Sequence, residues 1–163
     1  MRLFVLLYEF LCTRKLSYVL SIASCAVLGV LLFYKTTLSI DVIKNITSNV
    51  LNVNGILLGF TISILAIVVT SGDQNIDKAK NYKIGVKLWK DEFSLYDKLV
   101  INLAYTIIIQ GLILLTCFVI PNFIDTNYCH QLKLVSITVA ASAHVVFMII
   151  GITLDLYLIV SKK

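Results

Sequence analysis

The sequence predicts an all-α polytopic membrane protein, and three observations support this prediction. Hydrophobic residues make up 59% of the 163 residues and charged residues only 14%, against roughly 45–50% and 25% in soluble domains. Four apolar stretches are long enough to cross a hydrocarbon core that needs about 20 helical residues. The mean hydropathy is +0.93. A soluble domain of this size cannot bury so much apolar surface, so much of it must face lipid.

The four predicted spans form a single transmembrane domain over residues 1–163. They cover residues 16–34, 47–71, 99–120 and 132–160. An Asn-rich turn is expected to open the second span, and Pro121 is expected to end the third. The fourth span is longer than a bilayer requires, so it should tilt or protrude into the cytoplasm. Apolar residues within 3–11 are too few to cross and predict a helix lying at the interface.

The distribution of Lys and Arg predicts the orientation. Eleven of these residues lie in the N-terminal arm, in the loop over residues 72–98 and at the C-terminus. Only Lys35, Lys44 and Lys133 lie on the other side. Because cytoplasmic segments carry the excess of Lys and Arg, both termini and the 72–98 loop should be cytoplasmic in a bacterial inner membrane. The same bias explains the net charge of +5 without a nucleic-acid partner.

Small and polar residues recur at steps of three or four along the second span. This stripe consists of Asn45, Asn49, Asn52, Gly55, Gly59, Ser63, Ala66 and Thr70. Within it, Gly55, Gly59 and Ser63 extend a G-x-x-x-G spacing that allows two helices to approach closely. The stripe is therefore a candidate for helix packing or oligomerisation. Packing against another helix of the same chain is the usual role, and a subunit contact or a pore lining are the alternatives.

Polar residues also mark one face of the third span. Asn102, Thr106 and Gln110 are spaced i, i+4, i+8. Because an unpaired amide is costly in hydrocarbon, Asn102 and Gln110 should point inward. They can simply bond to neighbouring helices, or they can join Asn45, Asn49 and Asn52 of the second span in a polar seam, either within the bundle or at an oligomer axis.

Two ionisable residues of the fourth span are further candidates for this seam. His144 lies near the middle of the span, and Asp155 lies three turns closer to the cytoplasm on the same face. A proton or ion pathway is one interpretation, because histidine changes charge near neutral pH. A hydrogen-bonded core histidine is favoured, because a relay normally needs more members.

The 72–98 loop is the main soluble surface. Trp89, Phe93 and Tyr96 fall at i, i+4, i+7, and Lys87 and Lys90 lie nearby, which predicts a short amphipathic helix. Its aromatic side chains suit either an anchor at the membrane interface or a docking site for a cytosolic protein.

The sequence holds no signature of an enzyme. It contains no nucleophile elbow, no glycine-rich phosphate loop and no H-E-x-x-H motif. The four cysteines form no C-x-x-C pair and no cluster of metal ligands. No catalytic residue, cofactor or metal is expected.

Residues 54–61, which read NGILLGFT, open the most apolar part of the second span. Together with four short-looped helices and a cytoplasmic N-terminus, they resemble the membrane subunit of bacterial Kiwa anti-phage defence systems. The resemblance implies a homo-oligomer, with a tetramer as the expected form. It also implies a soluble DNA-binding partner held at the inner membrane and a response to phage attachment.

These observations favour an oligomeric inner-membrane sensor or scaffold that recruits a soluble cytosolic effector. A pore that depolarises the membrane is the first alternative, and it requires the Asn faces of the second and third spans to line one axis. A bacteriocin-immunity or superinfection-exclusion protein is the second alternative. Such a protein would bind an invading membrane protein laterally and would need no soluble partner.

Overall fold

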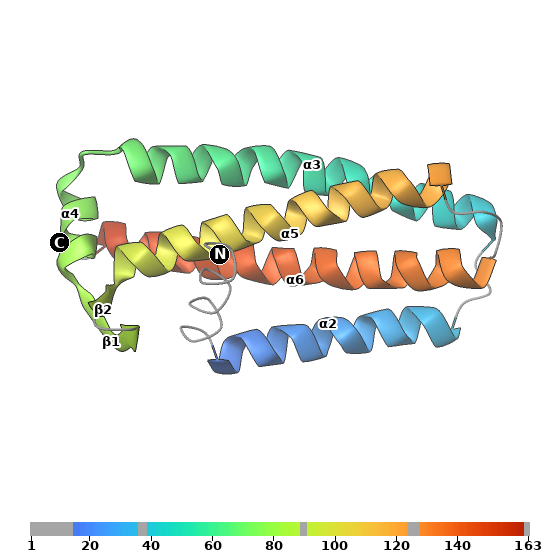
Figure 1. Cartoon of the computed structure of the whole chain (residues 1–163), viewed down its shortest axis with the longest axis horizontal. Coiled ribbons are helices and arrows are strands. Elements are labelled where there is room, and N and C mark those ends of the chain that lie inside the picture. Colours follow the sequence, from blue (N-terminus) through green and yellow to red (C-terminus); the bar gives the residue numbers. More distant parts are fainter. Residues whose placement is uncertain (1–14, 36–38, 89–90, 124–127, 162–163) are drawn as a thin grey trace.

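The computed structural model describes residues 15–35, 39–88, 91–123 and 128–161. Four long helices lie side by side in a bundle: α2 (Lys15–Lys35), α3 (Ile40–Thr70), α5 (Leu95–Phe123) and α6 (Tyr128–Ser161) (Figure 1). A short helix, α4 (Gln74–Asn81), and a hairpin of β1 (Lys83–Leu88) and β2 (Asp91–Ser94) lie at one end (Figure 1). The helical bundle is as predicted, and the small sheet is an addition to it.

Three of the helices are long and apolar enough to cross a membrane. The stretches that meet both conditions are Asp41–Thr70, Leu95–Val119 and Gln131–Val160. Within the side chains that the structure describes, the apolar stretch of α2 is the shorter Ser21–Leu31. The predicted interfacial segment over residues 3–11 lies outside the described residues.

The helices α3 and α5 begin earlier than their predicted spans, and their caps explain why. Residues 40–46 are helical rather than an Asn-rich turn, because Ser39 caps α3 and Ile43 packs against Leu132 and Val135. The helix α5 begins at Leu95 because Ser94 and Asp97 exchange hydrogen bonds as a capping box. It continues past Pro121 to Phe123.

The segment over residues 74–94, here called the cap, is packed onto the bundle end. Ile76 and Ala79 of α4 are buried together with Leu95 and Leu99 of α5 and with Ile159 of α6. The predicted amphipathic helix around Trp89 is wrong, because β1 and β2 pair there as an antiparallel hairpin. Tyr82, between α4 and β1, accepts a hydrogen bond from the Leu95 amide at the beginning of α5, at 3.0 Å.

The core of the bundle lies between α3, α5 and α6. Its middle layer is formed by the buried side chains of Ile113, Cys117 and Val145. The helix α2 packs chiefly against α6 and so forms an outer member of the bundle (Figure 1). This arrangement leaves one side of α3 and one side of α2 on the outer surface.

Candidate functional site

The polar face of α5 is buried inside the protomer. Asn102, Thr106 and Gln110 are each 0% exposed, so the prediction that Asn102 and Gln110 point inward is confirmed. The Thr106 hydroxyl donates to the Asn102 carbonyl at 2.7 Å, within its own helix. These three residues therefore do not line an axis shared between subunits, which removes half of the basis for the pore hypothesis.

The cap end of this face carries a buried ion pair. Lys98 Nζ of α5 lies 2.8 Å from Asp155 Oδ1 of α6, and the Asp155 side chain is only 8% exposed. The Asn102 amide faces the other carboxylate oxygen at 3.5 Å. Asp155 is thus held by two residues of α5, and the pair fixes the beginning of α5 to the last turns of α6.

His144 lies deeper in the bundle, where it joins three helices. Its Nδ1 lies 2.8 Å from the Ser21 hydroxyl of α2, and its Nε2 lies 3.3 Å from the Tyr105 hydroxyl of α5. The rings of Tyr105 and His144 meet edge to face, with their planes 84° apart. Both ring nitrogens therefore have partners, as the core-histidine interpretation predicts.

Asn54 forms a further interhelical contact that the sequence interpretation did not single out. Its amide donates to the Ser142 hydroxyl of α6 at 3.0 Å, and the residue is 1% exposed. Thr47 and Thr61, seven residues to either side, are buried on the same face of α3. This seven-residue spacing was the signal in the sequence that could have identified the inner face of α3.

The small-and-polar stripe of α3 lies on the opposite side of the helix from Asn54. All eight of its residues are exposed, from Asn45 to Thr70. A Cβ atom placed on Gly55 or Gly59 would meet no other atom within 4 Å among the described residues. The usual role, packing against another helix of the same chain, is therefore wrong for the described part of the chain.

The stripe borders a groove between α3 and α5. Asn52, Gly55 and Ile56 form the α3 side, and Gly111 and Leu115 contribute to the α5 side. The volume of the groove is about 660 Å³. Because Gly111 also has open space beside it, two glycines on adjacent helices leave the surface hollow at this depth.

The predicted docking residues do not form a common outer face. Phe93 is buried at 9% exposure, and Tyr96 is half-buried against the core cluster at the cap end. Lys80 of α4 lies over the Tyr96 ring, 5.3 Å from its centre. Lys87 lies in β1, and Trp89 and Lys90 lie outside the described residues. A strand signal was present, because Ile84, Val86 and Leu88 alternate with other residues.

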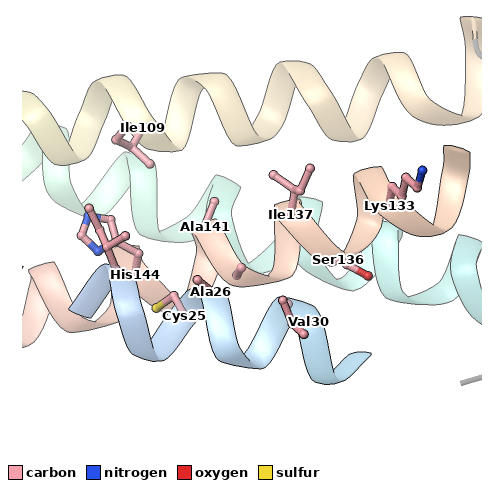
Figure 2. A pocket seen from close by; sticks show the side chains of 12 residues that line it. Cys25, Ala26, Val30, Ile109, Lys133, Ser136, Ile137, Ala141 and His144 are labelled. Carbon is pink, nitrogen blue, oxygen red and sulfur yellow. The ribbon is translucent and has the colours of Figure 1, made fainter. Parts of the chain in front are cut away.

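A second cavity lies between α2 and α6, with His144 at one end and Lys133 at the other (Figure 2). In the described part of the chain, no group of three or more His, Cys, Asp and Glu residues is placed to hold a metal ion. Cys25 and Cys117 are buried as free thiols. Comparisons with protein-family models, with curated proteins and with solved structures give no match to this chain.

Proposed function

We propose that the chain is an oligomeric scaffold or sensor that spans a bacterial inner membrane four times, with both termini and the cap in the cytoplasm. Copies associate through the stripe of α3, and the cap recruits a soluble cytosolic effector. The observation that carries this proposal is the exposure of the whole stripe on a helix whose opposite face buries Thr47, Asn54 and Thr61. The anti-phage setting comes from the resemblance to Kiwa membrane subunits.

The cost of exposing an amide to lipid supports self-association. A hydrocarbon core of about 30 Å covers about 20 of the residues of α3. The apolar part of α3 covers Asp41–Thr70, and any stretch of about 20 residues within it includes Asn52. An Asn52 amide facing lipid has no hydrogen-bond partner there, whereas a second copy of the chain supplies one.

Gly55 and Gly59 also favour a second copy of the chain as the partner of the stripe. Gly55 and Gly59 leave the α3 backbone open to close approach, and the adjacent groove with Gly111 can receive side chains from a facing helix. A second copy presents the same stripe, so a two-fold contact is self-complementary. A ring of more copies, such as the expected tetramer, uses the stripe against the α3–α5 groove.

The cap supports the recruiting role. Its inner side is fixed to the bundle through Ile76 and Ala79, while its outer side exposes charged and polar groups. Among the cap side chains that the structure describes, the exposed ones are Gln74, Asp77, Lys78, Lys80, Asn81, Tyr82, Lys83 and Glu92. A mixed charged surface on a rigid base is suited to a protein partner, whereas a nucleic acid would favour a uniformly basic one.

Self-association is tested with Gly59→Leu, which places a large side chain on the stripe. We expect at least a tenfold increase in the dissociation constant of the oligomer, measured by single-molecule photobleaching across protein-to-lipid ratios in liposomes. Gly59→Ala should keep most of the association. Val53→Phe adds bulk on another exposed side of α3 and is the matched control. Equal dissociation constants for Gly59→Leu and Val53→Phe would refute the stripe contact.

Recruitment is tested with a charge reversal in the cap. A soluble protein that co-purifies stoichiometrically with the wild-type chain should be lost or weakened in Lys78→Glu. The control is Lys44→Glu, which makes the same charge change at the opposite end of the bundle. A partner that tolerates Lys78→Glu, Lys80→Glu and Lys83→Glu together would not dock on the cap.

The exposed Asn residues are also compatible with the two alternative functions, a pore and an exclusion protein. Asn45, Asn49 and Asn52 are the polar residues of the proposed pore that still face outward, so a conducting oligomer would line its axis with α3 alone. An immunity or superinfection-exclusion protein would instead use the stripe to bind a helix of the invading membrane protein. Conductance abolished by Asn52→Leu would favour the pore, and a stable monomer would favour exclusion.

A further inference from the structure

The cavity between α2 and α6 has the shape and lining of a site for a hydrocarbon chain. Its volume is about 570 Å³, within the range of about 300–1,000 Å³ that small-molecule sites occupy. Ile22, Ala26 and Val30 line it from α2, and Ile137 and Ala141 line it from α6. Figure 2 shows Ala26, Val30, Ile137 and Ala141 along the cavity, between His144 and Lys133.

The cavity opens to the outside of the bundle rather than toward the core. Val30 is 54% exposed and Ile137 is 64% exposed, although both line it. On its inner side, Gly29 brings α2 close to α6: a Cβ there would lie 3.3 Å from both the Ala140 Cβ and the Ser136 carbonyl oxygen. The approach of the two helices thus forms a wall, and the opposite side is open to the surrounding lipid.

The length of the cavity matches one leaflet. Lys133 and His144 are eleven residues apart on α6, which corresponds to about 16 Å along a helix. Half of a hydrocarbon core of about 30 Å is about 15 Å. Lys133 lies near the beginning of the apolar part of α6, where a lysine side chain reaches the headgroup region. His144 then marks the floor of the cavity near the middle of the bilayer, where Ser21 and Tyr105 hold its ring.

We propose that this cavity binds one acyl chain of a phospholipid from the outer leaflet, with the headgroup phosphate at Lys133. The apolar walls accept the chain, and the ammonium group of Lys133 complements the phosphate. The site favours an anionic headgroup, because a zwitterionic lipid brings a positive charge to the same rim. This inference requires the bundle to lie in a membrane but does not depend on self-association or on the cap.

The test uses the full-length protein in detergent micelles that contain equal amounts of phosphatidylglycerol and phosphatidylcholine. Native mass spectrometry should show one retained phospholipid per protomer, with phosphatidylglycerol in excess. Ala26→Trp fills the cavity and should lower lipid occupancy at least tenfold. Ala23→Trp, at an exposed position of α2 outside the cavity lining, is the matched control and should retain the lipid. Equal occupancy in the two variants would overturn the proposal.

The headgroup contact is tested with Lys133→Gln, which should reduce the preference for phosphatidylglycerol several-fold while a lipid is still retained. Lys44→Gln removes another cation of the same end and should leave the preference unchanged. If the preference survives Lys133→Gln, the headgroup assignment is wrong.

A measurement on the wild-type protein avoids any variant that fails to fold. Phosphatidylglycerol with a photoreactive group near the end of its acyl chain should label peptides that contain residues 22–30 and 133–144. Labels spread evenly over α3 and α5 would contradict the site.

Discussion

Lys98 Nζ and Asp155 Oδ1, 57 residues apart in the chain, lie 2.8 Å from each other beneath the cap. This ion pair fixes the helix that leaves the cap, α5, to the end of the helix that passes beside it, α6. Any movement of α6 along the bundle axis must therefore either carry the beginning of α5 with it or break the pair. The pair thus couples the long helices of the bundle to the end that carries the cap.

Removing one partner of this ion pair should lower the unfolding free energy more than replacing both partners with apolar residues. Lys98→Met leaves the Asp155 carboxylate buried without its cation, and we expect a loss of about 2–3 kcal/mol in unfolding free energy, the low end for buried pairs because Lys98 is 22% exposed. The double variant Lys98→Met with Asp155→Leu should recover most of the loss. Reversible unfolding in mixed micelles measures both.

The exposed pair of Lys80 and Asp77 is the control for this experiment. Its side chains are 49% and 63% exposed, and Lys80→Met should change stability by less than about 1 kcal/mol. A Lys98→Met variant as stable as Lys80→Met would mean that Asp155 is hydrated rather than held.

The hydrogen bond from Ser21 to His144 should control the docking of α2. Ser21→Ala removes a polar contact between α2 and α6, so α2 should separate more often and expose Cys25, which is 4% exposed. We expect maleimide to modify Cys25 several times faster than in the wild type. Ser24→Ala is the control, because the Ser24 hydroxyl bonds only to the Ser21 carbonyl of its own helix. Identical rates in both variants would show that the bond does not hold α2.

Asn52 and Asn54 offer a matched pair on one helix. Asn54→Ala removes an interhelical hydrogen bond and should lower protomer stability by about 0.6–2 kcal/mol. Asn52→Ala should leave protomer stability unchanged and weaken the oligomer, since Asn52 is exposed on the stripe. Reversible unfolding measures the protomer stability, and single-molecule photobleaching measures the dissociation constant of the oligomer. The opposite pattern would mean that α3 is rotated relative to its described orientation.

A charge placed under the cap should release it without unfolding the bundle. Ala79→Glu puts a carboxylate into the apolar cluster of Ile76, Leu95 and Leu99. We expect a large rise in hydrogen exchange over residues 74–94 and little change in α3 and α6. Lys78→Glu, on the exposed side of α4, should leave exchange as in the wild type. Exchange rising throughout the bundle in Ala79→Glu would show that the cap and the helices unfold together.

The sequence was sufficient for the helices because their apolar stretches are long and nearly uninterrupted. The same pattern placed Asn102 and Gln110 correctly, since a buried amide in an apolar helix has to point toward other helices. The sequence pattern could not show whether the stripe of α3 faces the other helices of the bundle or the outside. Small residues at Gly55 and Gly59 allow close packing against any helix, and whether that helix belongs to the same chain depends on tertiary contacts.

The cap was mispredicted because two periodicities compete there. Trp89, Phe93 and Tyr96 fit a helical spacing, while Ile84, Val86 and Leu88 fit a strand. Pairing between β1 and β2 favours the strand, and Ser94 then begins the next helix through its bonds with Asp97. The partners of His144 could not be predicted from the sequence either, because Ser21 lies 123 residues away in the chain.

The mass of the wild-type particle tests the central claim, self-association through α3, most directly. The protein is extracted from its own membrane in a mild detergent and weighed by native mass spectrometry, after brief crosslinking in the intact membrane. The account predicts a discrete multiple of the 18.2 kDa chain, with crosslinks between the α3 helices of different copies. A particle of one chain, with no crosslink between copies, would contradict it.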